Sequence, residues 1–172
     1  MEVFGLGVLL LGPSGIGKSE CGLDLILKGH RLVSDDLVVI RKFGVDRLLG
    51  SGPTDLQFHM ELRGLGIINI KELFGISVLS PKKILDLAID LVRWDSEKEY
   101  DRLGVEERSY SLLDVPVPLI AMPVAPGRNL ATLVEVAVRI QMLKNQGYSP
   151  SGDFFRKLES RLKSSSDEAW RL

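Results

Sequence analysis

The sequence predicts an α/β domain with a mixed sheet, in which a phosphate loop lies between the first strand and the first helix and further helices follow near the C-terminus. Three observations predict it. An apolar run at residues 3–11 has the length of a strand, the stretch GPSGIGKS after it matches G-x-x-x-x-G-K-[ST], and apolar residues recur at helical spacing in two later segments. A chain of 172 residues, 45% of them hydrophobic, can bury one core, so residues 1–172 are expected to form one domain.

The first three elements are expected to form a βαβ unit. The apolar run at residues 3–11 is uninterrupted, which is typical of a strand covered on both faces in a parallel sheet. A helix should begin at the phosphate loop and end near Gly29, since glycine readily adopts the left-handed conformation common just past a helix. The stretch HRLVSDD then predicts a second, parallel strand at residues 30–36, whose C-terminal end would share an edge with the first.

The middle of the chain predicts mainly antiparallel strands. Residues 37–43, 47–51 and 56–63 alternate in hydrophobicity and are separated by the turn-forming stretches GVD and GSGPTD. The segment at residues 80–95 is ambiguous. Ser80 and Pro81 resemble an N-cap and a first helical residue, whereas the apolar positions fit a strand nearly as well, so both alternatives stay open.

The last third predicts a strand and two helices. PVPLIAMPV, at residues 116–124, is expected to be a strand, and a long helix should follow, capped by Asn129 and ended by Gly147. Residues 149–172 are expected to form a C-terminal helix and tail. The apolar stripe of that helix would consist of Phe154 or Phe155, Leu158 and Leu162.

Composition excludes several classes of partner. The net charge of -1 and the pI near 6.1 argue against nucleic acid or an anionic membrane, since both select basic surfaces. The longest apolar run is about half the length that a membrane span requires, and no charged segment precedes it as in a signal peptide, so a cytoplasmic protein is expected. Cys21 is the only cysteine, so no internal disulfide can form.

The phosphate loop is the motif on which the functional prediction depends first. Its glycines would let backbone N–H groups approach phosphate oxygens, and the following helix would direct its positive end at the same anion. Lys18 would add a point charge, and Ser19 would bind Mg²⁺ through its hydroxyl. The predicted nucleotide-binding residues are Gly12, Pro13, Ser14, Gly15, Ile16, Gly17, Lys18 and Ser19.

Two acidic sites accompany the loop. Asp35 and Asp36 would lie at the edge where ligands bind, one able to hold magnesium through water and the other able to accept a proton. A solvated turn is the alternative. Glu61 and Arg63, two residues apart, would share a strand face and could bind metal and phosphate, or form an ordinary ion pair. His30 and His59 are expected to be structural or solvated.

These motifs together resemble a known family. The stretches GPSGIGKSE, GHRLVSDD, ELRGLGIINI, YDRLG and PGRNLATLVEVA, in this order and spacing, resemble the catalytic domain of HPr kinase/phosphorylase over nearly the whole chain. The resemblance implies a P-loop kinase-like fold and a bacterial enzyme that uses ATP and Mg²⁺. Its substrate would be a serine of HPr, the phosphocarrier of the sugar phosphotransferase system. The enzyme would also remove that phosphate with inorganic phosphate, releasing pyrophosphate, and would assemble as a homohexamer.

The resemblance also implies roles for single residues. Lys18 would contact the phosphates, while Ser19 and Glu61 would bind magnesium. Asp36 would be the catalytic base and Asp35 would orient or tune it, although exchanged roles stay open. Arg102, in YDRLG, would hold phosphate, and the loop at residues 123–128 would serve mainly phosphorolysis.

Two absences are expected from the same resemblance. The family's catalytic domain normally begins with a His-Gly pair upstream of the phosphate-loop strand, and Met1 falls after that position, so we expect a truncated chain whose activity is impaired. The family's N-terminal domain is also expected to be absent. A small-molecule P-loop kinase and a non-catalytic nucleotide-sensing module are the alternative functions that the sequence leaves open.

Overall fold

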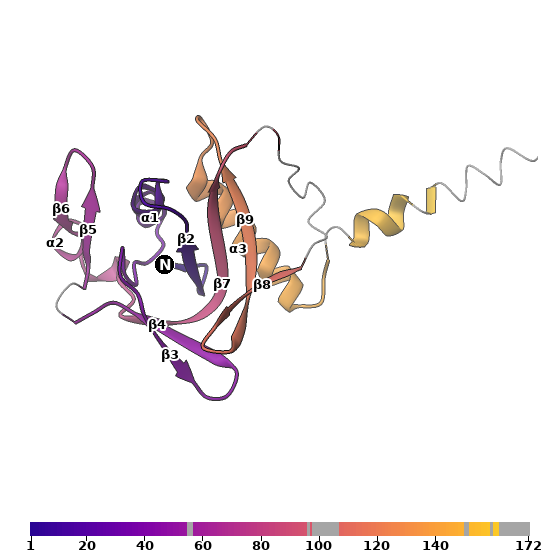
Figure 1. Cartoon of the computed structure of the whole chain (residues 1–172), viewed down its shortest axis with the longest axis horizontal. Helices are drawn as coiled ribbons and strands as arrows, with labels where there is room; N and C mark the ends of the chain where they lie inside the picture. Colours follow the sequence, from indigo (N-terminus) through magenta and orange to yellow (C-terminus); the bar gives the residue numbers. More distant parts are fainter. Residues whose placement is uncertain (55–56, 96, 98–106, 150–151, 159, 162–172) are drawn as a thin grey trace, which may run out of the picture.

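A mixed seven-stranded sheet forms the centre of the chain (Figure 1). The structure, a computed structural model, describes residues 1–54, 57–95, 97, 107–149, 152–158 and 160–161. The strands of this sheet are β1 (Glu2–Val3), β2 (Leu6–Leu11), β3 (Val39–Phe43), β4 (Arg47–Ser51), β7 (Lys82–Arg93), β8 (Arg108–Leu112) and β9 (Val115–Val124). Helices α1 (Lys18–Leu27) and α3 (Leu130–Asn145) pack against one face of β2, β7 and β9 through the largest buried core.

The single first strand predicted at residues 3–11 is wrong, because the chain turns back within it. β1 and β2 pair antiparallel, with Val3 opposite Leu6. The two residues between them, Phe4 and Gly5, have φ angles of 49° and 83°. Two consecutive left-handed residues form the tight turn whose twist suits a two-residue hairpin. An apolar run without polar residues therefore concealed a turn.

The predicted βαβ pairing is also wrong in its second strand. The parallel neighbour of β2 is β7, with Leu11 opposite Asp90. Residues 30–36 form no regular strand and make only two isolated bridges, Arg31 with Glu2 and Leu32 with Leu79. The reason is that β1 and β7 pair with β2 on its two edges, so the segment lies outside β1 instead.

β7 resolves the ambiguity at residues 80–95 in favour of a strand. It spans 12 residues, so the helical alternative is wrong. Its first residues pair antiparallel with β4, and its later residues pair parallel with β9. Leu87, Ala88 and Ile89 are buried in succession, because α1 and α3 cover one face of β7 while β4, β8 and β9 contribute to the core on the other. A strand buried on both faces lacks the alternation that would distinguish it from a helix.

The predicted antiparallel strands are confirmed in part. β3 and β4 form the expected hairpin. The third strand is shorter than residues 56–63 and does not extend that hairpin. Instead, β5 (His59–Leu62) pairs with β6 (Gly66–Asn69) in a separate two-stranded sheet, which leads into α2 (Ile70–Phe74) and the 3₁₀ helix η1 (Ile76–Val78). This small sheet lies beside α1 (Figure 1).

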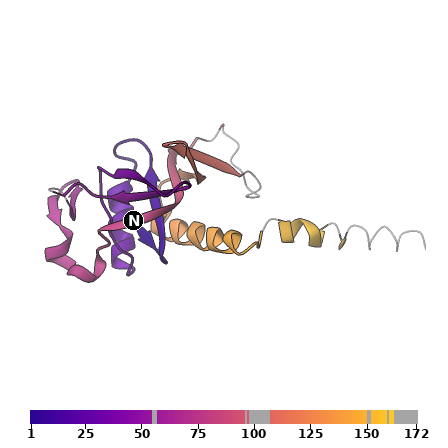
Figure 2. The same ribbon diagram turned by 90° about the horizontal axis from the view of Figure 1, so that it is seen from below.

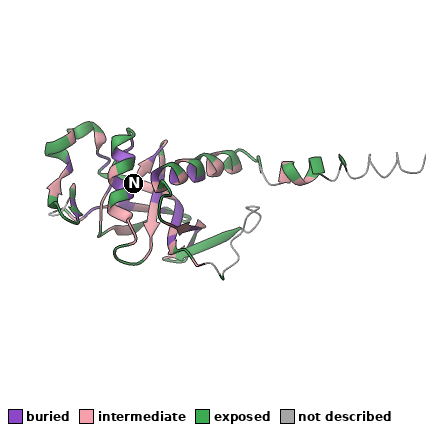
Figure 3. Cartoon of the chain, turned by 90° about the horizontal axis from the view of Figure 1, so that it is seen from above, coloured by how far each residue is buried: buried purple, intermediate pink, exposed green. Residues whose placement is uncertain are grey.

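The C-terminal elements follow the prediction. The side chain of Asn129 accepts a hydrogen bond from the Thr132 N–H and caps α3, while Gly147 has the predicted left-handed φ of 83°. Beyond α3, residues 152–158 are helical and lie away from the sheet (Figure 2). Figure 3 shows the outward face of this segment as exposed, and Phe154 is 57% exposed. Leu162 lies outside the described residues.

Candidate functional site

The phosphate loop joins β2 to α1 and owes its shape to three glycines. Gly12, Gly15 and Gly17 have φ angles of 134°, 76° and 104°, which favour glycine. A methyl group on Gly12 would lie 2.6 Å from the Leu91 carbonyl oxygen, so the loop rests directly on β7. α1 begins at Lys18, so the positive end of the helix directly follows the loop, as the motif predicts.

The polar side chains of the motif lie close to the loop. The Lys18 ammonium donates to the Gly12 carbonyl at 2.9 Å and to the Pro13 carbonyl at 3.1 Å, so the side chain folds back over the loop. The Ser19 hydroxyl donates to Asp35 Oδ2 at 3.1 Å. The structure therefore brings together the loop and the first of the two predicted acids, although these acids do not follow a regular strand.

Asp35 is the most connected acid of the site. Its Oδ2 atom also accepts a hydrogen bond from the Glu61 N–H at 3.3 Å, which attaches β5 to the phosphate-loop side of the molecule. Burial raises the pKa of Asp35 above its ordinary value, and the neighbouring charge of Asp36 adds to the increase. The hydrogen bonds from Ser19 and Glu61 oppose this shift by stabilising the carboxylate.

A cavity of about 550 Å³ lies beside most of the predicted site residues. The polar side chains that line it include Lys18, Ser19, Asp35, Asp36, Glu61 and Arg63. A methyl group on Gly15 would lie 2.7 Å from the Arg63 guanidinium, so Arg63 reaches the phosphate loop. The volume of the cavity is within the range of small-molecule binding sites.

Glu61 of β5 and Arg63, in the turn after it, both line the cavity, but Arg63 lies outside the strand, so the predicted shared strand face is wrong. Glu61 and Arg63 form no ion pair with each other, although the structure describes both residues. Gly64 and Gly66, with φ angles of 86° and 85°, shape the turn between β5 and β6. Their role is thus in the hairpin that presents Arg63.

Sequence reasoning missed lining residues of the cavity that come from β3 and β8. They are Ile40 of β3 and Tyr110 and Leu112 of β8. Tyr110 and Leu112 are two residues apart and so share a face of β8, which was the available signal. The sequence alone does not show that β3 and β8 line the same cavity, because the placement of these strands depends on the fold.

Of the two remaining predicted site elements, the structure describes the loop at residues 123–128 but not Arg102. Arg102 lies outside the described residues. The predicted loop at residues 123–128 begins with the last two residues of β9, which is parallel to β7, and its remainder lies at the same edge of the sheet as the phosphate loop. Its Arg128 guanidinium donates to the Pro123 carbonyl at 3.2 Å.

The histidines and the cysteine fit structural roles. His30 is buried and hydrogen-bonded to Glu135. Burial raises the pKa of the Cys21 thiol to about 12, so this thiol is no nucleophile near neutral pH.

In the part of the chain that the structure describes, no helix is long and apolar enough to span a membrane.

The loop between β2 and α1, with lysine, serine and acids at one cavity, defines a P-loop protein with a kinase-like mixed α/β sheet. Residues 1–158 match the family described as "HPr Serine kinase C-terminal domain", and the chain belongs to that family. It is 52% identical over 162 residues to an HPr kinase/phosphorylase of Geobacter sulfurreducens, and 46% identical over 162 residues to one of Peptoclostridium acidaminophilum.

The coverage of these relatives is asymmetric. Each alignment covers 94% of this chain but only 51% and 53% of the two relatives, so the chain spans about half the length of the curated relatives it matches. The solved structure of the HPr(Ser) kinase/phosphatase from Coxiella burnetii is similar over 89% of this chain and 93% of that chain. The TM-score is 0.79 and the identity 36%. The P-loop kinase-like fold predicted from the sequence is confirmed.

Proposed function

We propose that this chain is a catalytic domain that transfers phosphate from ATP to a serine of the phosphocarrier HPr. In the reverse direction it removes that phosphate with inorganic phosphate and releases pyrophosphate. The observation that carries the proposal is the contact between Ser19 of the phosphate loop and Asp35, within one cavity that also contains Lys18, Asp36 and Glu61. Membership of the HPr serine kinase family supports the choice of HPr as the acceptor.

The nucleotide phosphates would bind at the loop formed by residues 12–19. Backbone N–H groups and the Lys18 ammonium would neutralise their charge. The oxygens of Ser19, Asp35 and Glu61 have the chemistry that Mg²⁺ prefers. Among the described residues no group of three acidic, histidine or cysteine side chains forms a metal site alone, which fits an ion held largely by phosphates and water. Bound magnesium would neutralise phosphate charge.

Asp36 is our choice for the catalytic base. It lines the cavity, and within the described part of the chain its carboxylate has no hydrogen-bonding partner, whereas the carboxylate of Asp35 accepts bonds from Ser19 and Glu61. In the kinase direction Asp36 would take the proton of the serine hydroxyl. In phosphorolysis it would return that proton to the departing serine oxygen. Asp35 would orient Ser19.

The remaining expectations extend beyond the cavity. Arg102 would hold a phosphate group, and the loop at residues 123–128 would assist phosphorolysis. We also propose that the protein is a cytoplasmic homohexamer without a nucleic-acid or membrane partner. These assignments rest on the family resemblance and on composition.

The test is to incubate the chain with Mg-ATP and HPr and to detect phosphoserine by mass spectrometry. Wild-type chain should phosphorylate HPr on serine, and pyrophosphate should be released when phosphorylated HPr meets inorganic phosphate. Lys18→Ala should abolish both reactions and the thermal stabilisation by Mg-ATP, while its unfolding stays cooperative, because Lys18 faces ligand and not core. Absence of phosphoserine with wild-type chain, or full activity of Lys18→Ala, would refute the proposal.

A further inference from the structure

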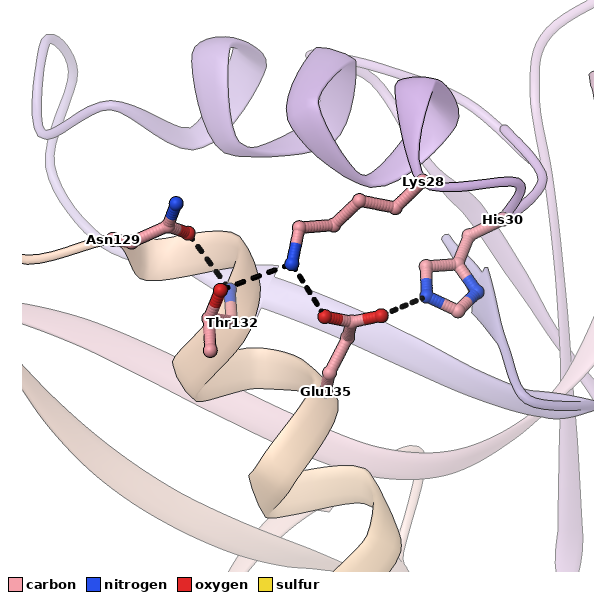
Figure 4. Close-up of polar contacts among 5 residues, drawn as sticks. All are labelled: Lys28, His30, Asn129, Thr132 and Glu135. Atoms are coloured by element: carbon pink, nitrogen blue, oxygen red, sulfur yellow. Dashed lines mark hydrogen bonds and ion pairs between the residues drawn. The ribbon is translucent and has the colours of Figure 1, made fainter.

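A polar cluster joins the far end of the phosphate-loop helix to α3 (Figure 4). Glu135 of α3 uses both carboxylate oxygens: Oε2 accepts from the Lys28 ammonium at 2.6 Å, and Oε1 lies 3.0 Å from Nε2 of His30. The Lys28 ammonium also donates to the Thr132 hydroxyl at 2.9 Å. His30 is only 6% exposed and Glu135 19%. The imidazole is therefore screened from water, where such contacts are stronger than at a surface, whereas the Lys28 end of the cluster is partly exposed.

The cluster lies at the C-terminal end of α1. Lys28 is the C-cap of α1, and the His30 N–H donates to the Leu25 carbonyl where the helix ends. A helix C-terminus carries partial negative charge, which repels a carboxylate. Glu135 is stable there because Lys28 and His30 contact it, and the bond from Lys28, followed by that from His30, lowers the pKa of Glu135. The carboxylate thus connects two helices rather than capping α1.

α3 also supports the near end of α1. Leu130, the first residue of α3, lies beside the phosphate loop, since a methyl group on Gly17 would be 3.7 Å from Leu130 Cδ1. Ile16 and Leu130 pack on the same buried core. α1 has 10 residues and is about 15 Å long. α3 therefore contacts α1 at both ends, through an apolar contact at the loop and the polar cluster at the opposite end.

A third element stabilises the cluster. The ring of Phe4, in the turn between β1 and β2, meets His30 edge-on at 4.7 Å, and the Arg139 guanidinium lies 4.1 Å above the centre of the same ring. His30 is therefore held by the hairpin that precedes the phosphate loop as well as by α3. The β1–β2 hairpin, α1 and α3 are all connected through this one buried imidazole.

We propose that Glu135 is a positioning residue for nucleotide binding, which acts through Lys28 and His30 to hold α1 so that its N-terminus faces the phosphates. This inference rests on the nucleotide site of the proposed function. The amides and the dipole of α1 bind an anion well only in the correct direction. A helix attached at its loop end alone could tilt about that end, and the cluster prevents the tilt.

The experiment measures the affinity of the whole 172-residue chain for Mg-ATP by calorimetry, well below the unfolding temperature. Glu135→Ala should raise the Kd for Mg-ATP about tenfold, the lower end of the effects seen when a supporting side chain is removed from a site. Glu135→Gln should recover most of the loss, because the amide can accept from Lys28 through its oxygen and still reach the His30 ring. Gln141→Ala is the matched control: it removes a bond within α3, to Asn145, and should leave the Kd unchanged.

Three outcomes decide the question. A lower Tm for Glu135→Ala with an unchanged Kd would show a purely structural role and overturn the inference. If Glu135→Ala does not fold, Lys28→Ala replaces it, because Lys28 is more exposed and its loss leaves the His30 contact. An unchanged Kd in Lys28→Ala would then overturn the inference equally. Failure of wild-type chain to bind Mg-ATP would refute the proposed function itself, and the inference with it.

Discussion

Asp35 shows how one residue can lower stability while serving the site. Its pKa is raised, mainly by burial, so the folded chain binds this proton more tightly than the unfolded chain does. The ionised carboxylate therefore destabilises the fold at neutral pH, and stability increases as the pH falls through the folded-state pKa. A buried charge that costs stability at working pH is typical of functional sites.

We expect Asp35→Asn to raise the Tm of the ligand-free chain at pH 7.5. Asparagine can still accept the bond from Ser19 but carries no charge that burial penalises. The gain should shrink as the pH is lowered toward the pKa of Asp35, and Mg-ATP should stabilise the variant less than wild type. Thermal unfolding across this pH range, with and without Mg-ATP, checks both statements. A lower Tm at pH 7.5 would contradict the argument.

Asp36→Asn should remove kinase and phosphorolysis activity together. A group that takes a proton in one direction must return it in the other, and a general base contributes about 10² to 10⁴ in rate. Phosphoserine formation and pyrophosphate release are the two measurements. Asp46→Asn, at an exposed acid between β3 and β4, is the control and should keep both rates. Loss of only one direction would exclude Asp36 as the shared base.

Among the secondary-structure elements, β2 and α1 each contain a glycine, and the space available for a side chain differs between the two positions. A methyl group on Gly7 of β2 would lie 1.8 Å from the Ile84 carbonyl oxygen of β7, at a register shift where the Gly7 N–H donates to the Asp86 carboxylate at 2.7 Å. The nearest atom to a methyl group on Gly22 of α1 is the flexible end of Met60, at 3.4 Å. Only the first position needs glycine for space.

Gly7→Ala should therefore destabilise the chain by about 1 to 3 kcal/mol, the usual cost of overpacking, because backbone atoms would have to move. Gly22→Ala, its matched partner, should stabilise by up to about 1 kcal/mol through helix propensity. Urea unfolding measures both changes. Equal effects of the two substitutions would show that the strand contact does not limit the packing of β2 on β7.

The sequence predicted best those elements whose signals are local. The phosphate loop, the Asn129 cap and the Gly147 terminus depend on a few neighbouring residues, and all three are confirmed. The pairing of strands, in contrast, depends on residues that are far apart in the sequence. The strand predicted at residues 30–36 failed because β1 and β7 pair with β2 on its two edges, and β7 was ambiguous because burial on both faces removes periodicity.

The residues of the candidate site were predictable where a local motif specifies them, and were missed where only the fold brings them to the cavity. Six of the eight loop residues and the acids at 35, 36 and 61 line one cavity, and the exceptions in the loop are Pro13 and Ile16. Ile40 and Tyr110, which also line the cavity, come from two hairpins whose positions only the folded sheet determines. Their hydrophobicity resembles that of any core residue, so no residue-type signal separates them from the interior.

At the level of the whole molecule, the helical segment at residues 152–158 presents apolar side chains to solvent. Phe154 is 57% exposed and Leu158 42%. Deletion of residues 150–172 should therefore reduce oligomer size or HPr affinity, while the Kd for Mg-ATP stays at the wild-type value, because none of the residues that the structure describes in this segment lines the cavity. Light scattering and calorimetry are the measurements. Hexamers with full HPr affinity after deletion would refute the expectation.

The pairing of β2 with β7 has a consequence for how the protein is made. Leu11, directly before the phosphate loop, pairs with Asp90, so the strand beneath the loop arrives 79 residues later in synthesis. On a ribosome the loop and α1 emerge long before that strand, and an isolated helix of 10 residues is marginal in water. A nascent chain therefore gains an ordered nucleotide site only after β7 has been translated, and a fragment that stops before β7 should not bind ATP.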